Sequence, residues 1–143
     1  MRFMMLVRAS KESEAGALPS KELLAAMGRF NEEMVKAGVL IAGDGLQPSS
    51  KGTRVTFAGS QRTFTDGPFA EIRELLAGFW MIDVKSKADA LAWASRVPFV
   101  DGEVIEVRQV FEAEDFPADV FPPEEAAREQ KLRDELQRQA AQR

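Results

Sequence analysis

Alternating apolar residues predict a β-strand at the start of the chain and another near residue 110. Along residues 2–8 one face is wholly apolar, and the mixed face opposite holds Arg2, Met4, Leu6 and Arg8. Residues 104–111 alternate in the same way, and one of their faces holds Val104, Glu106, Arg108 and Val110. Residues 77–84 are apolar on both faces, which predicts a central strand or an interface strand.

Two other stretches repeat their apolar residues at helical spacing. Ser20 stands where the N-cap of the first helix would lie, and Gly38 follows its last turn. Ser86 begins the second helix, which Pro98 stops. Between these elements we predict a polar loop at residues 9–19, a short buried strand at residues 39–42 and a loop at residues 43–48.

Residues 53–57 and 61–65 flank a short turn and predict a β-hairpin, which the tetrad Asp66-Gly67-Pro68-Phe69 follows. Each residue of the tetrad suits a tight turn. Asp66 would accept hydrogen bonds from backbone N–H groups two or three residues on, and Gly67 tolerates backbone angles that other residues resist. Pro68 would begin a helical turn, and Phe69 would anchor that turn in a core.

A functional interpretation of the same segment competes with the structural one. Asp66, Glu71, Arg73 and Glu74 bring three carboxylates and a guanidinium into nine residues. If the loop borders a cleft, Asp66 or Glu71 could carry a proton and Arg73 could bind an anion. Surface ion pairs give the same composition, so this spacing alone selects neither interpretation.

The predicted order of elements is strand, helix, strand, hairpin, strand, helix, strand. It indicates an α+β fold with the ferredoxin-like βαββαβ plan and an inserted β-hairpin. Two helices cover only one face of such a sheet, and the other face would hold apolar side chains beside Arg8, Glu106 and Arg108. We therefore expect a second copy of the chain to cover that face, forming a homodimer.

Residues 1–111 are predicted to form this α+β domain, and residues 112–143 an acidic C-terminal extension that ends in a helix. Prolines after Phe116 and Phe121 prevent regular pairing there. The helix has three acid–base pairs at i,i+4 spacing: Glu124–Arg128, Glu129–Arg133 and Asp134–Arg138. Its apolar stripe is narrow, so we expect it to dock on the partner subunit or to fray, with fraying beyond about Leu136.

The net charge of −4 lies wholly in the extension, where residues 112–143 hold nine acids and five bases. The other 111 residues balance 14 acids against 14 bases, so they lack the basic footprint of a nucleic-acid-binding protein. No stretch approaches 18 consecutive apolar residues, and the run Phe3–Val7 is too short for a signal peptide. We therefore expect no nucleic-acid partner, no membrane partner and a cytoplasmic location.

Cysteine, histidine and tyrosine are all absent from the chain. The absence of histidine removes the usual general base near neutral pH and the commonest metal ligand. We expect no metal and no cofactor. The sequence leaves open whether the protein is an enzyme. Its chemistry would be at most of isomerase or lyase type, with Asp66 and Glu71 as the candidate carboxylates.

Five stretches of the chain resemble the YCII-related, DGPF-domain family: residues 30–43, 45–52, 66–69, 78–82 and 106–110. The tetrad at residues 66–69 gives that family its name, and the resemblance covers about residues 1–140. It implies a dimeric α+β barrel, in which the sheets of two ferredoxin-like subunits face each other around a cleft. Some relatives have a His–Asp pair proposed for acid/base work, which a chain without histidine cannot have.

Two functions from different classes follow. In the first, the protein binds a small polar or anionic molecule in the inter-subunit cleft; the candidate ligand-binding residues are Asp66, Arg73, Arg8, Glu106, Arg108 and Gln47, with Asp44 near Gln47. In the second, the protein is a regulatory protein–protein interaction module linked to sigma-factor-dependent transcription. That association is implied by the resemblance alone. An exposed apolar patch beyond the dimer interface would favour the second function.

Overall fold

A computed structural model describes residues 1–143 in two compact units, Met1–Val110 and Phe111–Arg143. The elements of the first unit are, in order, β1 (Arg2–Arg8), α1 (Lys11–Glu14), α2 (Lys21–Lys36), β2 (Leu40–Gly45), the 3₁₀ helix η1 (Ser49–Lys51), β3 (Thr53–Ala58), β4 (Gln61–Asp66), the 3₁₀ helix η2 (Ile72–Glu74), β5 (Leu76–Asp83), α3 (Lys87–Ser95) and β6 (Ile105–Gln109). No helix of the chain is both long enough and apolar enough to cross a membrane.

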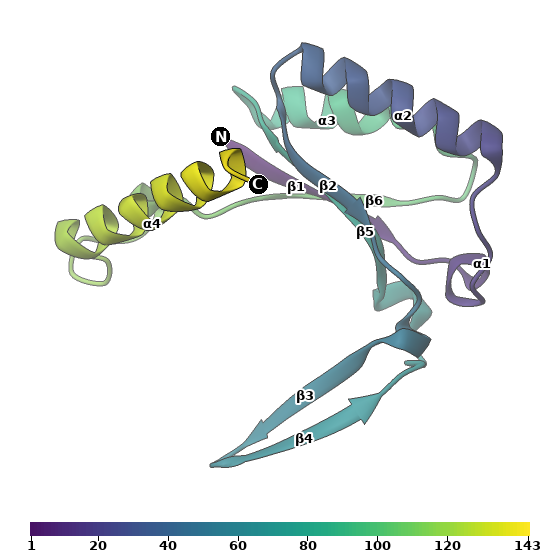
Figure 1. Cartoon of the computed structure of the whole chain (residues 1–143), viewed down its shortest axis with the longest axis horizontal. Helices are drawn as coiled ribbons and strands as arrows, with labels where there is room; N and C mark the ends of the chain where they lie inside the picture. Colours follow the sequence, from purple (N-terminus) through teal and green to yellow (C-terminus); the bar gives the residue numbers. More distant parts are fainter. The chain divides into compact units, whose positions relative to one another are not determined.

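The first unit is built on a four-stranded antiparallel sheet with the strand order β2-β5-β1-β6. Helices α2 and α3 cover one face of this sheet, and the β3–β4 hairpin forms a separate two-stranded sheet (Figure 1). This is the α+β, ferredoxin-like arrangement with an inserted hairpin that the sequence predicts. The central strand predicted at residues 77–84 is β5, which lies between β2 and β1.

The core lies between the sheet and the two helices. Phe3 and Met5 of β1 are fully buried there, in the same cluster as Phe30 of α2. Phe30 meets the Trp80 ring edge-on at 5.6 Å between centroids, and the Trp80 Nε1–H donates a 2.8 Å hydrogen bond to Asn31 Oδ1. The buried indole therefore has a partner for its polar atom, as a tryptophan in a core requires.

The structure corrects two local predictions. The predicted loop at residues 9–19 contains the short helix α1, because Ser10 and Ser13 form a reciprocal capping box at its start. The predicted short, buried strand at residues 39–42 is the longer strand β2, and every residue after Leu40 is exposed. β2 is an edge strand with a neighbour on one side only. It continues through Gly43, where an added Cβ would lie 2.6 Å from the Trp80 ring.

The second unit consists of the 3₁₀ helix η3 (Ala113–Asp115) and helix α4 (Pro123–Ala141). Phe116 contacts the rings of both Phe111 and Phe121, at centroid distances of 4.9 and 5.8 Å. Of the three predicted i,i+4 ion pairs only Glu129–Arg133 forms; the other two arginines pair with a carboxylate three residues earlier. α4 continues to Ala141, beyond the predicted fraying point. Arg138 and Gln139 both bond to Glu135 and support this last turn.

Candidate functional site

The face of the sheet opposite α2 and α3 combines an apolar centre with charged edges. On β1, Leu6 lies opposite Phe79 of β5 and Glu106 of β6, and Met4 lies opposite Met81 and Arg108. Paired residues of adjacent strands project on the same side, so these side chains share one surface. We call this surface the open face. Its residues are Met4, Leu6, Arg8, Phe79, Met81, Glu106, Arg108 and, from the edge strand β2, Asp44.

The charged edge of the open face brings together three of the residues predicted from strand parity. Arg8 Nη1 donates a 2.9 Å hydrogen bond to Glu106 Oε1, and Arg108 Nε lies 4.0 Å from Glu106 Oε2. The Arg8 side chain is only 29% exposed. Its Nε is shielded from solvent and has no hydrogen-bond acceptor. Glu106 therefore holds one corner of the guanidinium and leaves a buried donor of Arg8 unsatisfied.

An unsatisfied buried donor is unusual in a folded protein. Leaving such a group without a partner costs about 1–3 kcal/mol, so most buried N–H groups have an acceptor. Arginine binds carboxylates and phosphates through two parallel N–H groups, commonly with two hydrogen bonds at once. The Arg8 guanidinium is thus only partly paired within the chain.

Asp66 has a hydrogen-bond partner across the hairpin. Its Oδ1 accepts a 2.7 Å hydrogen bond from the Thr53 hydroxyl, and the Gly67 N–H donates to the Gly52 carbonyl at 3.0 Å. The sequence predicted backbone N–H donors two or three residues beyond Asp66, and that local cap is not formed. Thr53 and Asp66 are register partners at the base of the β3–β4 hairpin. The side chain therefore finds its donor across the strands.

The rest of the tetrad is a loop and not the start of a helix. Pro68 follows a cis peptide bond, and η2 begins only at Ile72, so the predicted helical turn at Pro68 is wrong. Phe69 is held by the Arg54 guanidinium, whose central carbon lies 3.8 Å from the ring centroid. The Phe69 backbone N–H also donates a hydrogen bond to the Ser49 hydroxyl. Contacts with η1 and the hairpin base therefore position this loop.

Ser49 links three segments that are distant in the sequence. Its hydroxyl donates to Glu14 Oε2 at 2.5 Å and accepts a 3.1 Å hydrogen bond from the Phe69 N–H. The Ser49 backbone N–H also donates to Glu14 Oε1, at 3.0 Å. Glu14 belongs to α1, Ser49 to η1 and Phe69 to the tetrad. No local pattern predicts this connection, because its partners are 35 and 20 residues apart.

Replacing Ser49 with alanine is expected to lower the free energy of unfolding by about 1–2 kcal/mol, because the Phe69 N–H and the Glu14 carboxylate each lose a hydrogen-bond partner. Urea denaturation followed by circular dichroism measures this change. The neighbouring Ser50→Ala is the control, since Ser50 is exposed and its hydroxyl makes no hydrogen bond. Equal stability of the two variants would contradict the Ser49 network.

The remaining sequence-predicted residues are not brought together with the Arg8 cluster by any hydrogen bond or ion pair. Glu71, Arg73, Gln47 and Asp44 are exposed, and none of their side chains has a hydrogen-bond or salt-bridge partner. The concentration of charge in residues 66–74 is thus not an ion-pair network. No group of three or more acidic side chains is placed to hold a metal ion. Ligand contact by these residues stays a prediction.

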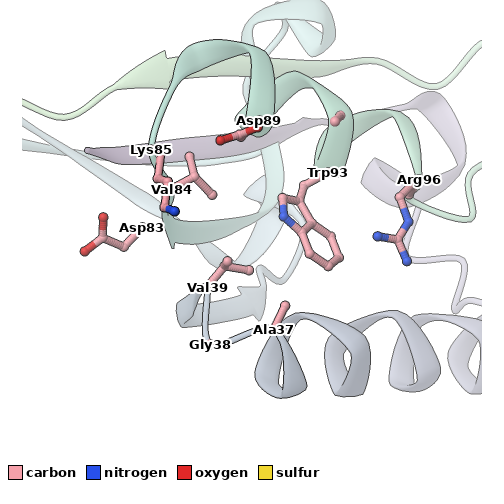
Figure 2. Close-up of a pocket in the computed structure, with 10 residues that line it drawn as sticks. Ala37, Gly38, Val39, Asp83, Val84, Lys85, Asp89, Trp93 and Arg96 are labelled. Carbon is pink, nitrogen blue, oxygen red and sulfur yellow. The ribbon is translucent and has the colours of Figure 1, made fainter.

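A shallow pocket of about 550 Å³ lies where the α2–β2 and β5–α3 connections meet, and sequence reasoning did not indicate it. Figure 2 shows the Trp93 indole beside Arg96, with Asp83 on the other side of the pocket. The Arg96 guanidinium lies over the Trp93 ring at 4.4 Å and also pairs with Glu33. Glu33 thus offsets the positive charge of Arg96 at this pocket, as Glu106 does for Arg8 on the open face.

Comparison with known proteins identifies one domain family. A family model described as the YCII-related domain matches residues 1–114, which include the whole sheet, both covering helices, the hairpin and the tetrad. No curated protein sequence matches the chain.

Proposed function

The chain belongs to the YCII-related domain family, and on that premise we propose that it binds a small polar or anionic molecule in a cleft between the open faces of two copies. Arg8 is the principal anion-binding residue in this proposal. Arg108 adds a second positive charge at the same edge, and Glu106 orients Arg8.

The observation that supports this function most directly is the convergence of two arginines, Arg8 and Arg108, on one carboxylate, Glu106. A carboxylate or phosphate would balance the remaining positive charge and accept a hydrogen bond from one of the exposed N–H groups of these arginines. The hydrogen bond would be charge-assisted, which makes it roughly twice as strong as a neutral one. Glu106 already binds Nη1 at 2.9 Å, so the guanidinium keeps one orientation before a ligand arrives. A pre-positioned donor loses less conformational entropy on binding.

The apolar centre of the open face supports the dimer. Met4, Leu6, Phe79 and Met81 form a continuous stripe on the two middle strands, opposite the helix-covered face. An apolar stripe bordered by charges is typical of a protein–protein contact. Two copies related by a twofold axis would present the same stripe to each other and bring two Arg8 clusters to one cleft.

Replacing Arg8 with alanine is expected to weaken anion binding by about tenfold or more, because at least one charge-assisted hydrogen bond is lost. Isothermal titration with acetate, malonate, benzoate and inorganic phosphate measures the dissociation constants. Arg8→Lys keeps the charge but loses the planar guanidinium with its several N–H donors, so we expect it to bind more weakly than the parent.

The control for this experiment is Arg29→Ala, which removes an exposed arginine without a side-chain partner from α2, on the other side of the sheet. It leaves the predicted binding site intact and removes one positive charge, as Arg8→Ala does. Equal affinities of the Arg8 and Arg29 variants would exclude Arg8 as the binding residue. Absence of binding of all four probes to the parent at millimolar concentration would count against anion recognition itself.

A further inference from the structure

The β3–β4 hairpin has one polar face and one apolar face. Register pairs Val55 with Phe64 and Phe57 with Arg62, and these four side chains project on the same side. The Arg62 guanidinium lies over the Phe57 ring at 4.3 Å. The opposite side holds small and polar residues: Arg54, Thr56, Ala58, Gln61, Thr63 and Thr65.

Nothing in the unit Met1–Val110 covers the apolar face of the hairpin. Phe57 and Phe64 are 71% and 70% exposed, and Val55 is 44% exposed. A two-stranded hairpin is marginally stable in water unless it packs against something else. Val55, Phe57 and Phe64 lie together on one side of the hairpin, so these exposed apolar side chains point to an occupant outside the unit Met1–Val110.

The size of the open face suggests that a dimer formed through the sheet would need further contact area. Four strands at about 4.8 Å spacing and about five residues each give roughly 300 Å² of flat area. A standard stable interface buries about 800 Å² of accessible surface on each partner. The hairpin adds roughly 200 Å² of flat area, and three of the six residues on one side are apolar. A dimer that uses both surfaces therefore approaches the usual size more closely than one that uses the sheet alone.

The direction of the hairpin fits the same conclusion. It leaves the sheet between β2 and β5 and projects on the side away from α2 and α3, which is the side of the open face (Figure 1). Contacts at its base hold it there, including the Thr53–Asp66 and Glu14–Ser49 hydrogen bonds. A second copy seated on the open face would thus lie within reach of the hairpin.

We propose that the β3–β4 hairpin is an arm whose Val55, Phe57 and Phe64 pack against a second copy of this chain seated on the open face. This inference rests on the dimer of the proposed function and extends it by assigning the contact surface. The tetrad and Ser49 are then the anchor of the arm, and each copy contributes one arm to its partner.

Replacing both phenylalanines (Phe57→Ser with Phe64→Ser) is expected to raise the dimer dissociation constant at least about 100-fold, because two buried aromatic side chains are lost. Sedimentation equilibrium over a wide range of concentrations measures it. The control is Thr56→Ser with Thr63→Ser, a cross-strand pair on the opposite face of the same hairpin, which should leave the constant unchanged. Circular dichroism checks that each variant keeps its secondary structure.

A second measurement identifies the occupant. The chain has no cysteine, so Val55→Cys and Thr56→Cys each introduce one reporter, on the apolar and the polar face of the hairpin. We expect alkylation of Val55→Cys by iodoacetamide to slow at least about tenfold as protein concentration rises through the dimer range. Alkylation of Thr56→Cys should stay fast throughout.

The possible outcomes separate this inference from the proposed function. A parent that dimerises, with a double phenylalanine variant that dimerises equally well, overturns the arm and leaves the open-face dimer intact. A parent that is monomeric at every concentration overturns both. Protection of Val55→Cys that does not depend on concentration shows cover by the same chain and overturns the arm. Rapid alkylation at every concentration also overturns it and leaves a different protein as the candidate occupant.

Discussion

Gly67→Ala is expected to lower the free energy of unfolding by about 3 kcal/mol. A Cβ at this position would lie 1.8 Å from the Ser49 carbonyl oxygen and 2.6 Å from its carbonyl carbon. Both atoms belong to the backbone, so they cannot move aside as a flexible side chain would. The Gly67–Gly52 and Phe69–Ser49 hydrogen bonds also hold the two segments together. The alanine must therefore separate the tetrad from η1, and urea denaturation measures the cost.

The control for Gly67→Ala is Gly28→Ala in the interior of α2. An added Cβ at Gly28 has nothing within 4 Å, and alanine favours a helix over glycine by about 0.5–1 kcal/mol. This variant should equal or exceed the parent in stability. Parent-like stability of Gly67→Ala would mean that the tetrad does not approach Ser49 closely in solution. The anchor assigned to the arm would then be wrong.

Phe30→Ala is expected to have the other large effect, a loss of about 3–5 kcal/mol in the free energy of unfolding. Phe30 is almost fully buried and contacts the rings of both Trp80 and Trp93, at centroid distances of 5.6 and 6.2 Å. Truncation would leave a cavity between α2, α3 and the sheet, which these rigid rings could fill only in part. Thermal or urea unfolding followed by tryptophan fluorescence reports directly on that region.

Leu24→Ala is the matched control for Phe30→Ala, because Leu24 lies on the exposed side of the same helix. Leucine and alanine have similar helix propensities, so a change within about 0.5 kcal/mol is expected. Comparable losses in the two variants would show that α2 does not pack on the sheet through Phe30. The assignment of the covered and open faces would then be wrong as well.

Strand parity predicted from the sequence which charged residues share the open face. Arg8 of β1 and Glu106 and Arg108 of β6 all have even residue numbers, as do the other residues on the mixed faces of these two strands. A strand exposes alternate residues on each face, so the sequence was sufficient to group them. The antiparallel register then set the distances: it opposed Leu6 to Glu106 and brought Arg8 within 2.9 Å of Glu106. The alternation of residues could not predict that the Nε of Arg8 lacks a hydrogen-bond partner.

The tetrad shows where prediction from local chemistry failed. Each residue suited a turn, and the segment is a turn, but the expected partners were the nearest ones in sequence. Asp66 instead accepts from Thr53, and Gly67 is required because the Ser49 carbonyl lies against it. Such requirements depend on which strand ends meet in space. No local pattern in a single sequence indicates that these two segments come into contact.

By itself, the sequence determined the elements whose signals are local. Ser20 and Ser86 cap the two covering helices, Gly59 turns the hairpin with a φ of 59°, and the alternation along β1 and β6 sets their two faces. The three-dimensional fold was needed to show that Glu14, Ser49 and Phe69 join, that β2 is an exposed edge strand, and that the unit Met1–Val110 leaves the apolar face of the hairpin uncovered. Caps, turns and periodicity act over a few residues, whereas these contacts depend on chain segments that only folding brings together.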